Sequence, residues 1–514
     1  MKKLLVFNLP KILFLSILPV FLGLSFGVFF GFNADNAQAD EEQKTGTGDF
    51  VVGMECNYQP FDWQTSKPTK TSISIGSAGY CDGYDVIVAR KIANQIGKNL
   101  SVKKISWEGL QPALESGVID TIISGVTATP ERQKGMDFTT SYYSSEMVML
   151  VRKDSPESKF NSIKQFSGLT VISQKNTTYD EVIDQIKGVK HGVPKDTFSV
   201  LVYALQNNQT NGVTCELPVA QGIVRSNSNL GIVKFSEGQG FLADTNVSIA
   251  FAKGAAQTPL FQSVQNALNK ITLQDKEKYM QEAVDSHSAY ESESDEPSGF
   301  FATVVWIFQN NWYLFFTGTQ ITILLAILGT FFGFLIGLGL GLSEAAGIKA
   351  HNKPFTKLLK TIFNLLVKLY VFIFRGTPMM IQAIFIFYVL RPIFQWEPLT
   401  AAIIIISVNT GAYMSEIIRS GVQSVDIGQR EAAQSLGMTH SQQLLYIILP
   451  QAIRNSFPSI GNQFVVNIKD SCVLNVIGVI DLYFQSSSVS GSMMLFAQTF
   501  FITCIIYLIL TFLA

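Results

Sequence analysis

The feature that most constrains this fold is an apolar segment in the second half of the chain. Residues Leu314–Leu342 include no charged side chain, and the run exceeds the ~20 residues with which an α-helix crosses a bilayer. Charged residues are frequent in residues 50–285 and scarce after residue 300. The chain therefore joins a water-exposed part to a membrane part, and its overall averages of 47% hydrophobic and 15% charged residues describe neither.

Further apolar segments predict additional membrane spans. They are Met379–Leu390, Leu399–Ile418, Phe457–Ile480 and Met493–Ala514. The stretch Phe355–Phe374 is different, because three lysines, Lys357, Lys360 and Lys368, interrupt it. Such a pattern is typical of an amphipathic helix that lies on or enters the membrane surface. We therefore expect residues 310–514 to form an all-α membrane domain of about five transmembrane helices.

The N-terminus has the pattern of a targeting segment. Three lysines precede the apolar stretch Ile12–Phe32, and Ala37-Gln38-Ala39 resembles a signal-peptidase site. We predict that residues 1–39 are a signal peptide. An uncleaved membrane anchor is the alternative, and either one would export the domain that begins near residue 50.

Lys and Arg residues accumulate after the first predicted span, at Lys349, Lys353, Lys357, Lys360, Lys368 and Arg375. By the positive-inside rule they face the cytoplasm, which predicts a multi-pass cell-membrane protein with its first domain extracellular. The 38 Lys+Arg and 39 Asp+Glu residues nearly balance, so no basic face indicates nucleic acid.

The exported part alternates strands and helices. Phe50–Met54 and Thr121–Ile123 are strand-like, whereas Tyr84–Gly97 places its apolar residues on one helical face. This alternation predicts an α/β domain with largely parallel sheets, and residues 50–285 provide enough chain for two lobes. Residues 286–305 begin with acidic and small polar residues and are predicted to be an acidic linker. Cys56 and Cys81 are as compatible with a disulfide as with two buried thiols.

The most specific motif lies in a polar segment of the membrane part. Glu431-Ala432-Ala433 is followed by Gly437 and then by Ile447-Ile448-Leu449-Pro450. This pattern resembles the cytoplasmic loop of binding-protein-dependent ABC importers. Flanking stretches such as Arg375–Pro378 and Gly411–Glu416 are similar to the polar amino-acid permease family. A plain connecting loop is the alternative.

The resemblance implies that Glu431, Ala432, Ala433 and Gly437 couple the permease to an ATPase. The segment is expected to form two short helices that bend at Gly437, with Pro450 ending the second. The chain contains no G-x-x-x-x-G-K-[ST] phosphate loop, so we do not expect it to be an enzyme. The resemblance implies a permease homodimer above an ATPase dimer that holds Mg-ATP, and no cofactor or metal in this chain.

Several motifs in residues 50–285 resemble the amino-acid solute-binding family, a two-lobed periplasmic-binding-protein-like clamshell. They are Glu55–Phe61, Gly83–Asp85, Trp107–Gly117, Ser124–Arg132, Asp137–Tyr143 and Ser248–Gly254. The resemblance places residues 50–142 and 246–285 in the first lobe and the remainder in the second.

The resemblance also implies the ligand contacts. A free amino acid needs a guanidinium for its carboxylate, which is Arg132, with Ser124, Gly125 and Thr127 from the same stretch beside it. Its ammonium needs a carboxylate, which is Glu216. Tyr58 and Phe61 would pack against its stem, and Thr177 and Thr178 are further candidates for the carboxylate.

The acidic side chain of Glu55 matches a position where relatives that bind basic amino acids or glutamine carry an acid. We therefore expect glutamine or a basic amino acid (Arg, Lys or His) as the substrate. Asp85 is a candidate for the same site or for the hinge.

Two other classes use similar clamshell domains. A ligand-gated channel or chemoreceptor is the main alternative, but such channels insert spans between the lobes, and here every lobe motif precedes residue 286. An enzyme on the same fold needs a positioned general acid or base, whereas the motifs supply ligand-clamp residues.

Overall fold

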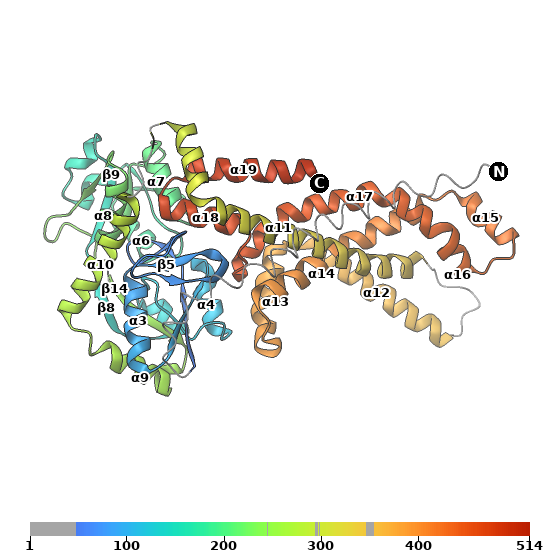
Figure 1. The fold of residues 1–514 in the computed structure, drawn as a ribbon, viewed down its shortest axis with the longest axis horizontal. Coiled ribbons are helices and arrows are strands. Elements are labelled where there is room, and N and C mark those ends of the chain that lie inside the picture. Colours follow the sequence, from blue (N-terminus) through green and yellow to red (C-terminus); the bar gives the residue numbers. More distant parts are fainter. Residues whose placement is uncertain (1–47, 244, 293–296, 298, 346–353) are drawn as a thin grey trace.

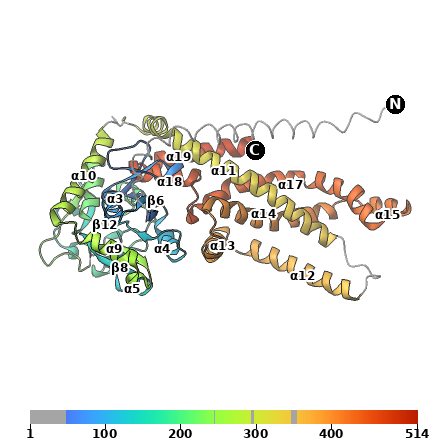
Figure 2. The same ribbon diagram turned by 60° about the horizontal axis from the view of Figure 1, so that its bottom comes forward.

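The computed structural model describes residues 48–243, 245–292, 297, 299–345 and 354–514. Figure 1 shows the α/β part at one end of an elongated molecule and the long helices extending away from it. The view in Figure 2 has the same arrangement. The predicted signal peptide, residues 1–39, lies outside the described residues.

The first lobe is built on a five-stranded sheet with the order β6-β1-β7-β14-β8. Its strands are β1 (Asp49–Met54), β6 (Asn99–Lys104), β7 (Thr121–Ile122), β8 (Met136–Ser144) and β14 (Asn246–Ala252). Strand β1 is parallel to β6 and β7, whereas β14 is antiparallel to β7 and β8. The predicted helix is confirmed as α3 (Tyr84–Ile96), whose residues Val86, Ile92 and Ala93 are buried.

The second lobe has a sheet of the order β11-β10-β12-β9-β13. Its strands are β9 (Met147–Arg152), β10 (Thr170–Ile172), β11 (Lys190–His191), β12 (Gly212–Glu216) and β13 (Leu230–Val233). Strand β9 is antiparallel to β12 and β13.

The expectation of largely parallel sheets is therefore wrong, because both sheets are mixed. The chain passes from the first lobe to the second just before β9, and it returns to the first lobe just before β14, so both strands start at the cleft. Strands β1 and β12 end at the cleft. The strands that enter a lobe from the cleft therefore run in the direction opposite to β1 in the first lobe and to β12 in the second.

A four-stranded sheet of the order β2-β3-β5-β4 lies beside the first lobe's main sheet. It contains β2 (Asn57–Tyr58), β3 (Asp62–Thr65), β4 (Ile73–Ser74) and β5 (Tyr80–Asp82). Cys56 and Cys81 form a disulfide with their Cα atoms 5.8 Å apart, which decides between the two interpretations of these cysteines.

Helix α10 (Leu273–Ser292) continues into the segment predicted to be a linker. Helix α11 (Phe300–Ala345) begins before the predicted start of the membrane domain. Residues between them, 293–296 and 298, are outside the described part. Lys278 and Glu282 form an i,i+4 ion pair on α10, an interaction that favours helix in a polar sequence.

In the described residues of the membrane part the regular secondary structure is helical. The main helices are α11, α12 (Pro354–Gly376), α13 (Met379–Phe394), α14 (Pro398–Gln423), α17 (Leu449–Asp470), α18 (Leu482–Met493) and α19 (Phe496–Leu513). Among the described residues three helices are long and apolar enough to cross a membrane, or up to four when the bent pair of α12 and α13 counts as one. That pair is bent by 112°.

The predicted helical membrane domain with several apolar helices is confirmed, although fewer than the expected five helices of the described residues meet this criterion of length and composition. The predicted span Phe457–Ile480 is divided, because α17 ends at Asp470 and a 3₁₀ helix, η8 (Ser471–Ile477), comes after it. Buried amides such as Gln463 and Asn467 also make α17 too polar to qualify. The lysine-bearing segment is one arm of the bent pair and bonds to α14, through Tyr370 to the Val408 carbonyl at 2.5 Å.

A stripe of glycines brings α11 and α14 into close contact. Gly329, Gly333, Gly337 and Gly341 recur every fourth residue and face α14. A Cβ atom on Gly333 would lie 2.6 Å from Cγ2 of Thr410, and one on Gly341 would lie 2.9 Å from the carbonyl oxygen of Ser415. Small residues at this spacing let membrane helices approach closely.

The segment that carries the motif Glu431–Pro450, called the motif loop below, lies at the end of the molecule farthest from the α/β part, as both views show. Helices α15 (Ile427–Ser435) and α16 (His440–Gln442) flank Gly437, whose φ of 73° is left-handed and makes the bend. The expectation that Pro450 ends the second helix is wrong. A π-helix, η7 (Gln443–Ile448), leads directly into α17, and Pro450 occupies the first turn of α17, where proline is tolerated.

Candidate functional site

A narrow pocket lies between the two lobes, where the strands end. Glu55 follows β1, Ser124 and Gly125 follow β7, and Gln174 follows β10. The lining residues are Glu55, Tyr58, Trp107, Ser124, Gly125, Thr127, Arg132, Gln174, Thr177, Thr178 and Tyr179. Ligands in such α/β sheets characteristically bind at the carboxyl ends of the strands.

The structure thus gathers eight of the predicted residues around one pocket. The other three, Phe61, Asp85 and Glu216, are buried behind it. Three lining residues were not assigned a role from the sequence: Trp107, Gln174 and Tyr179. Trp107 belongs to a motif that the sequence analysis singled out, whereas Gln174 and Tyr179 carry no local signal.

Arg132 is held at the pocket by its own lobe and by the other one. It lies on α5 (Pro130–Gly135), and its guanidinium carbon lies 5.2 Å from the centre of the Trp107 ring. Its Nη1 donates to the Thr127 carbonyl at 3.0 Å and its Nη2 to the Asn176 carbonyl at 3.1 Å. Burial lowers the pKa of Arg132, but a guanidinium titrates so high that it stays charged.

Gly125 is required by its surroundings. Its φ is +60°, and an added Cβ would lie 2.8 Å from Cε1 of Tyr58. Its N–H donates to Oδ2 of Asp85 at 2.9 Å, and the hydroxyl of Tyr142 donates to Oδ1 of Asp85 at 2.8 Å. Asp85 therefore supports the pocket backbone from behind and ties it to β8, the strand that leads to the other lobe.

Glu55 is a buried acid at the pocket wall. Its Oε1 accepts from Nε2 of Gln174 at 3.4 Å, and its own N–H donates to Oγ of Ser124 at 3.0 Å. Burial raises the pKa of Glu55 to about 8, Asp62 adds to this, and Lys104 and Gln174 act in the opposite direction. A ligand group with positive charge or an N–H donor would favour the ionised form.

Asp62 lies directly behind this wall. The Ser124 hydroxyl donates to its Oδ2 at 2.7 Å. Burial raises the pKa of Asp62 to about 6, while the hydrogen bond from Ser124 and the charge of Lys104 oppose the rise. The charge of Lys104 thus acts on the pKa of both buried carboxyl groups, Glu55 and Asp62, in the same direction.

Glu216 of the second lobe forms a hydrogen bond with the first lobe. Its Oε1 accepts from the hydroxyl of Tyr58 at 2.7 Å across the cleft, and from the hydroxyl of Tyr179 within its own lobe. Burial raises the pKa of Glu216 to about 7, against both tyrosine hydrogen bonds. In this arrangement the two tyrosines occupy Oε1 of the carboxylate that was predicted to receive a ligand ammonium, whereas its buried Oε2 has no hydrogen-bond partner among the described residues.

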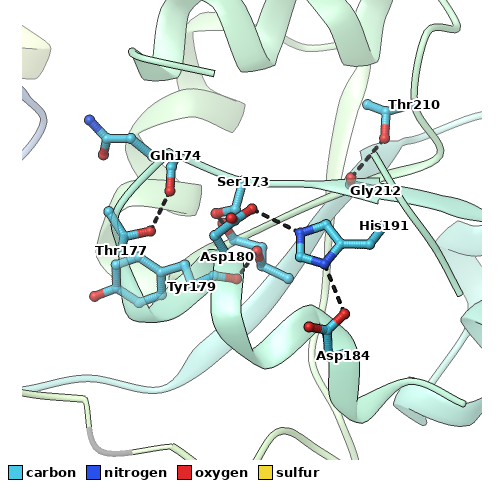
Figure 3. A network of polar contacts seen from close by, with 10 residues as sticks. Ser173, Gln174, Thr177, Tyr179, Asp180, Asp184, His191, Thr210 and Gly212 are labelled. Carbon is cyan, nitrogen blue, oxygen red and sulfur yellow. Dashed lines mark hydrogen bonds and ion pairs between the residues drawn. The ribbon is translucent and has the colours of Figure 1, made fainter. Parts of the chain in front are cut away.

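The second lobe presents a short helix to the pocket. Helix α6 (Thr178–Glu181) begins with Thr178, and the Thr177 hydroxyl before it donates to the Gln174 carbonyl at 2.6 Å. Figure 3 shows His191 between two carboxylates, at 3.1 Å from Asp180 of α6 and 2.9 Å from Asp184. Partial burial alone lowers the pKa of His191, but the hydrogen bonds to both carboxylates outweigh it and raise the pKa.

Both lobes also contact the helical part. In the first lobe, Nε2 of Gln59 donates to the carbonyl of Ser492 on α18 at 2.7 Å. In the second, Ser199 of α7 (Phe198–Gln206) lies 3.2 Å from the hydroxyl of Ser490, again on α18. One helix of the membrane part therefore touches both sides of the clamshell.

Two family models match the chain. Residues 50–284 match "Bacterial extracellular solute-binding proteins, family 3", and residues 339–514 match "Binding-protein-dependent transport system inner membrane component".

Curated relatives of the membrane part are amino-acid permeases. The glutamine transport system permease protein of Escherichia coli K12 is 32% identical over 201 residues, which are 38% of this chain and 86% of the relative. The L-cystine permease protein TcyB of Bacillus subtilis is 36% identical, covering 36% of this chain and 74% of the relative. The arginine permease protein ArtQ of the same species is 30% identical, covering 38% and 84%.

Among solved structures, the substrate-binding protein of an amino acid ABC transporter matches with 26% identity and a TM-score of 0.39, covering 46% of this chain and 98% of that one. The holo arginine-binding protein from T. maritima matches with 27% identity and a TM-score of 0.38, covering 46% and 96%.

Proposed function

Because the chain belongs to the amino-acid ABC importers, as a family 3 solute-binding domain fused to an inner-membrane permease domain, we propose that it captures glutamine or a basic amino acid. The binding domain would do so outside the cell and pass the ligand to the permease domain of the same chain.

The observation that carries this proposal is that one narrow pocket is lined by both Arg132 and Glu55. A guanidinium is suited to bind an α-carboxylate through two parallel hydrogen bonds. The buried acid Glu55 is suited to bind a cationic or amide side chain. The pocket thus offers Arg132 for the α-carboxylate that all amino acids share and Glu55 for the polar end of the side chain.

The residues around these two groups complete the proposed ligand shell. Thr178, the first residue of α6, supplies a hydroxyl for the carboxylate, and Gly125 supplies close backbone approach. Thr177 would join it by turning its hydroxyl from the Gln174 carbonyl to the ligand. Glu216 is proposed to receive the ligand's ammonium on its Oε2, because its Oε1 already accepts from the hydroxyls of Tyr58 and Tyr179.

The substrate class rests on Glu55 and on the relatives together. The permeases that resemble this chain are named for glutamine, L-cystine and arginine. An acidic wall favours the basic amino acids Arg, Lys and His by charge, and it can also accept from the side-chain amide of glutamine.

We further propose a homodimer of permease domains driven by a separate ATPase dimer that binds and hydrolyses Mg-ATP. The motif loop exposes large apolar side chains that fit such a partner: Ile427, Leu436 and Tyr446 are 71%, 81% and 71% exposed. Ala433 of the loop is buried, whereas Glu431 and Gly437 are exposed. The exposed set would contact the ATPase while the buried alanine holds the loop together.

The test is isothermal titration calorimetry of the full-length chain in lipid nanodiscs against each of the common amino acids. We expect binding of glutamine, of one or more basic amino acids, or of both, and no comparable heat from glycine or leucine. Binding of apolar amino acids alone would contradict the substrate class, and absence of binding to all of them would contradict the proposed function.

A further inference from the structure

A histidine of the second lobe lies between two carboxylates close to the pocket. His191 is the last residue of β11, which pairs in parallel with β10. Its Nε2 lies 3.1 Å from Oδ1 of Asp180, and its Nδ1 lies 2.9 Å from Oδ1 of Asp184. Figure 3 shows the ring directed at both side chains. Each ring nitrogen therefore faces a carboxylate oxygen.

This geometry suits the doubly protonated ring. A carboxylate oxygen accepts, and a neutral imidazole has one N–H donor, whereas an imidazolium has two. In the neutral form one ring nitrogen would direct its lone pair at a carboxylate. The side chains of His191 and Asp180 are 27% and 19% exposed, so little water is available to replace the lost bond. The ring is thus bound most favourably as an imidazolium with one N–H group on each acid.

The two acids belong to the segment that forms one wall of the pocket. Asp180 lies on α6 and Asp184 on the 3₁₀ helix that follows it, η5 (Val182–Gln185). Thr178 and Tyr179, directly before Asp180, line the pocket. Two like charges four residues apart on a helical segment repel each other. The imidazolium between the acids offsets this repulsion and binds both helices to β11 of the lobe's sheet.

The contacts that hold α6 come from two strands. From β12, Oγ1 of Thr214 donates to the Tyr179 carbonyl at 2.7 Å, and Glu216 accepts from the Tyr179 hydroxyl. From β11, His191 binds Asp180. A helix of four residues has little stability of its own, so its position depends on such contacts. Loss of the bond to His191 would leave α6 held from β12 alone among these contacts.

The charge of His191 depends on pH. Partial burial alone lowers its pKa, but the hydrogen bonds to Asp184 and Asp180 and the charges of both acids outweigh burial and raise the pKa above the ordinary 6.5. The elements that pack against the ring supply Asp180 from α6, Asp184 from η5 and the backbone of Val171 from β10. The contribution of the imidazolium is therefore present below about pH 6.5 and is lost as the pH rises through the raised pKa.

We propose that His191 is a positioning residue of the ligand pocket: its imidazolium holds Asp180 and Asp184 together and thereby fixes Thr178 and Tyr179, so that loss of its proton lowers amino-acid affinity. This inference rests on the proposed function, since it requires that α6 presents residues to the bound amino acid. A pocket whose wall is in place for only a fraction of the time binds its ligand more weakly by that fraction.

The experiment compares the wild type with His191→Gln, which is neutral at every pH. Affinity for L-glutamine is measured by calorimetry on the full-length chain in nanodiscs at about pH 5.5 and about pH 9, on either side of the histidine titration. L-Arginine replaces it if the wild type binds only arginine. The ratio of the two affinities isolates His191, because Glu55, Asp62 and Glu216 titrate in both chains. We expect the wild type to bind about threefold to tenfold more tightly at the lower pH and about equally at the higher pH.

Lys190→Gln is the matched control. Lys190 is the exposed neighbour of His191 on β11, and its substitution also removes one positive charge. The ratio of wild-type to Lys190→Gln affinity should stay near one at both pH values. A merely structural role for His191 would give a wild-type to His191→Gln ratio that is the same at both pH values, and that outcome would overturn the inference.

Failure of the inference is distinguishable from failure of the proposed function. A wild-type chain that binds no amino acid refutes the function, whereas binding with a ratio that does not change with pH refutes only the role of His191. Should His191→Gln not fold, Asp180→Asn decides, because it keeps the imidazole and removes the acid on α6. The ratio of wild-type to Asp180→Asn affinity should also fall as the pH rises, and a constant ratio would then overturn the inference.

Discussion

The hydroxyl of Tyr58 in the first lobe lies 2.7 Å from Oε1 of Glu216 in the second. Both side chains are buried, so this bond between lobes is shielded from water. The bond stabilises the arrangement in which the lobes touch. Tyr179 is a suitable comparison, because its hydroxyl donates to the same carboxylate of Glu216 from within the second lobe.

Tyr58→Phe is expected to shift the clamshell toward the open form. Loss of one hydrogen bond to a charged group weakens closure by about 1.5 kcal/mol, which is about tenfold in the ratio of closed to open molecules. Single-molecule energy transfer between labels on the two lobes, measured without added ligand, reports that ratio. Tyr179→Phe should leave it nearly unchanged, and equal shifts in both variants would contradict the assignment of Tyr58 as the interlobe contact.

Glu55 predicts a pH dependence of ligand binding. Burial raises its pKa to about 8, Asp62 adds to the rise, and Lys104 and Gln174 oppose it, so Glu55 holds a proton at lower pH. A cationic ligand requires the ionised form, so arginine affinity should rise with pH by up to about tenfold per unit up to about pH 8. Calorimetry across this range checks the slope.

Glu55→Gln is the control for that slope, since Asp62 and Lys104 also titrate in or near the range. The variant should bind arginine more weakly and show a flatter pH profile, and identical profiles would exclude Glu55 as the group responsible. The same acid contributes to folding in the direction set by its raised pKa. Its contribution to stability is present below its ordinary pKa of 4.5 and is lost as the pH rises through about 8.

The sequence specified local elements better than their assembly. Apolar periodicity located α3, and the motif loop located the bend at Gly437. The strands β9 and β14, by contrast, are as continuously buried as parallel strands usually are, so their antiparallel placement was missed. The division of the predicted span Phe457–Ile480 at Asp470 was missed for a related reason. The amides that interrupt α17 pack against other helices in the structure, as Asn467 does on Thr330 at 2.8 Å, and a hydropathy profile does not register such partners.

The residues that line the pocket were predictable where they belong to a motif of the solute-binding family. Ser124–Arg132 is such a stretch, and four of its residues line the pocket. Gln174 and Tyr179 belong to the second lobe and line the pocket because the two lobes face each other there, a long-range arrangement that no local pattern records. Lys104 carries no local sequence signal, because Ser488, which it contacts, lies 384 residues later in the chain.

The glycine stripe predicts that a larger side chain at a contact position between α11 and α14 destabilises the membrane part. A Cβ on Gly337 would lie 2.7 Å from backbone atoms of Met414 and Ser415, so the helices must separate to admit it. Gly337→Ala is expected to destabilise the membrane part by about 1–3 kcal/mol, measured as a lower Tm of the detergent-solubilised chain. Gly339→Ala on the same helix meets no atom within 4 Å and should leave the Tm unchanged or raise it; a fall of the same size would argue against the close contact.

Gly437→Ala tests the motif loop. The residue has φ +73° and open space around it, so the added methyl group strains only the backbone, by about 1–2 kcal/mol. We expect weaker association with the ATPase partner and slower ligand-stimulated ATP hydrolysis, with amino-acid affinity unchanged. Gly461→Ala, on α17 with no atom within 4 Å, is the control. Unchanged ATPase coupling in Gly437→Ala would show that the bend is not needed.

The central claim is that the ligand bound beside Arg132 is the one that the permease domain of this chain transports. Its most direct test is ATP-driven uptake of the bound amino acid into proteoliposomes that contain the full-length chain and its ATPase. Lys134→Ala serves as the control, because Lys134 is exposed on the same short helix. Arg132→Ala should lower both affinity and uptake at subsaturating ligand by about a hundredfold, the effect of about 3 kcal/mol from a buried charge-assisted contact. Uptake at the wild-type rate by Arg132→Ala would contradict the account.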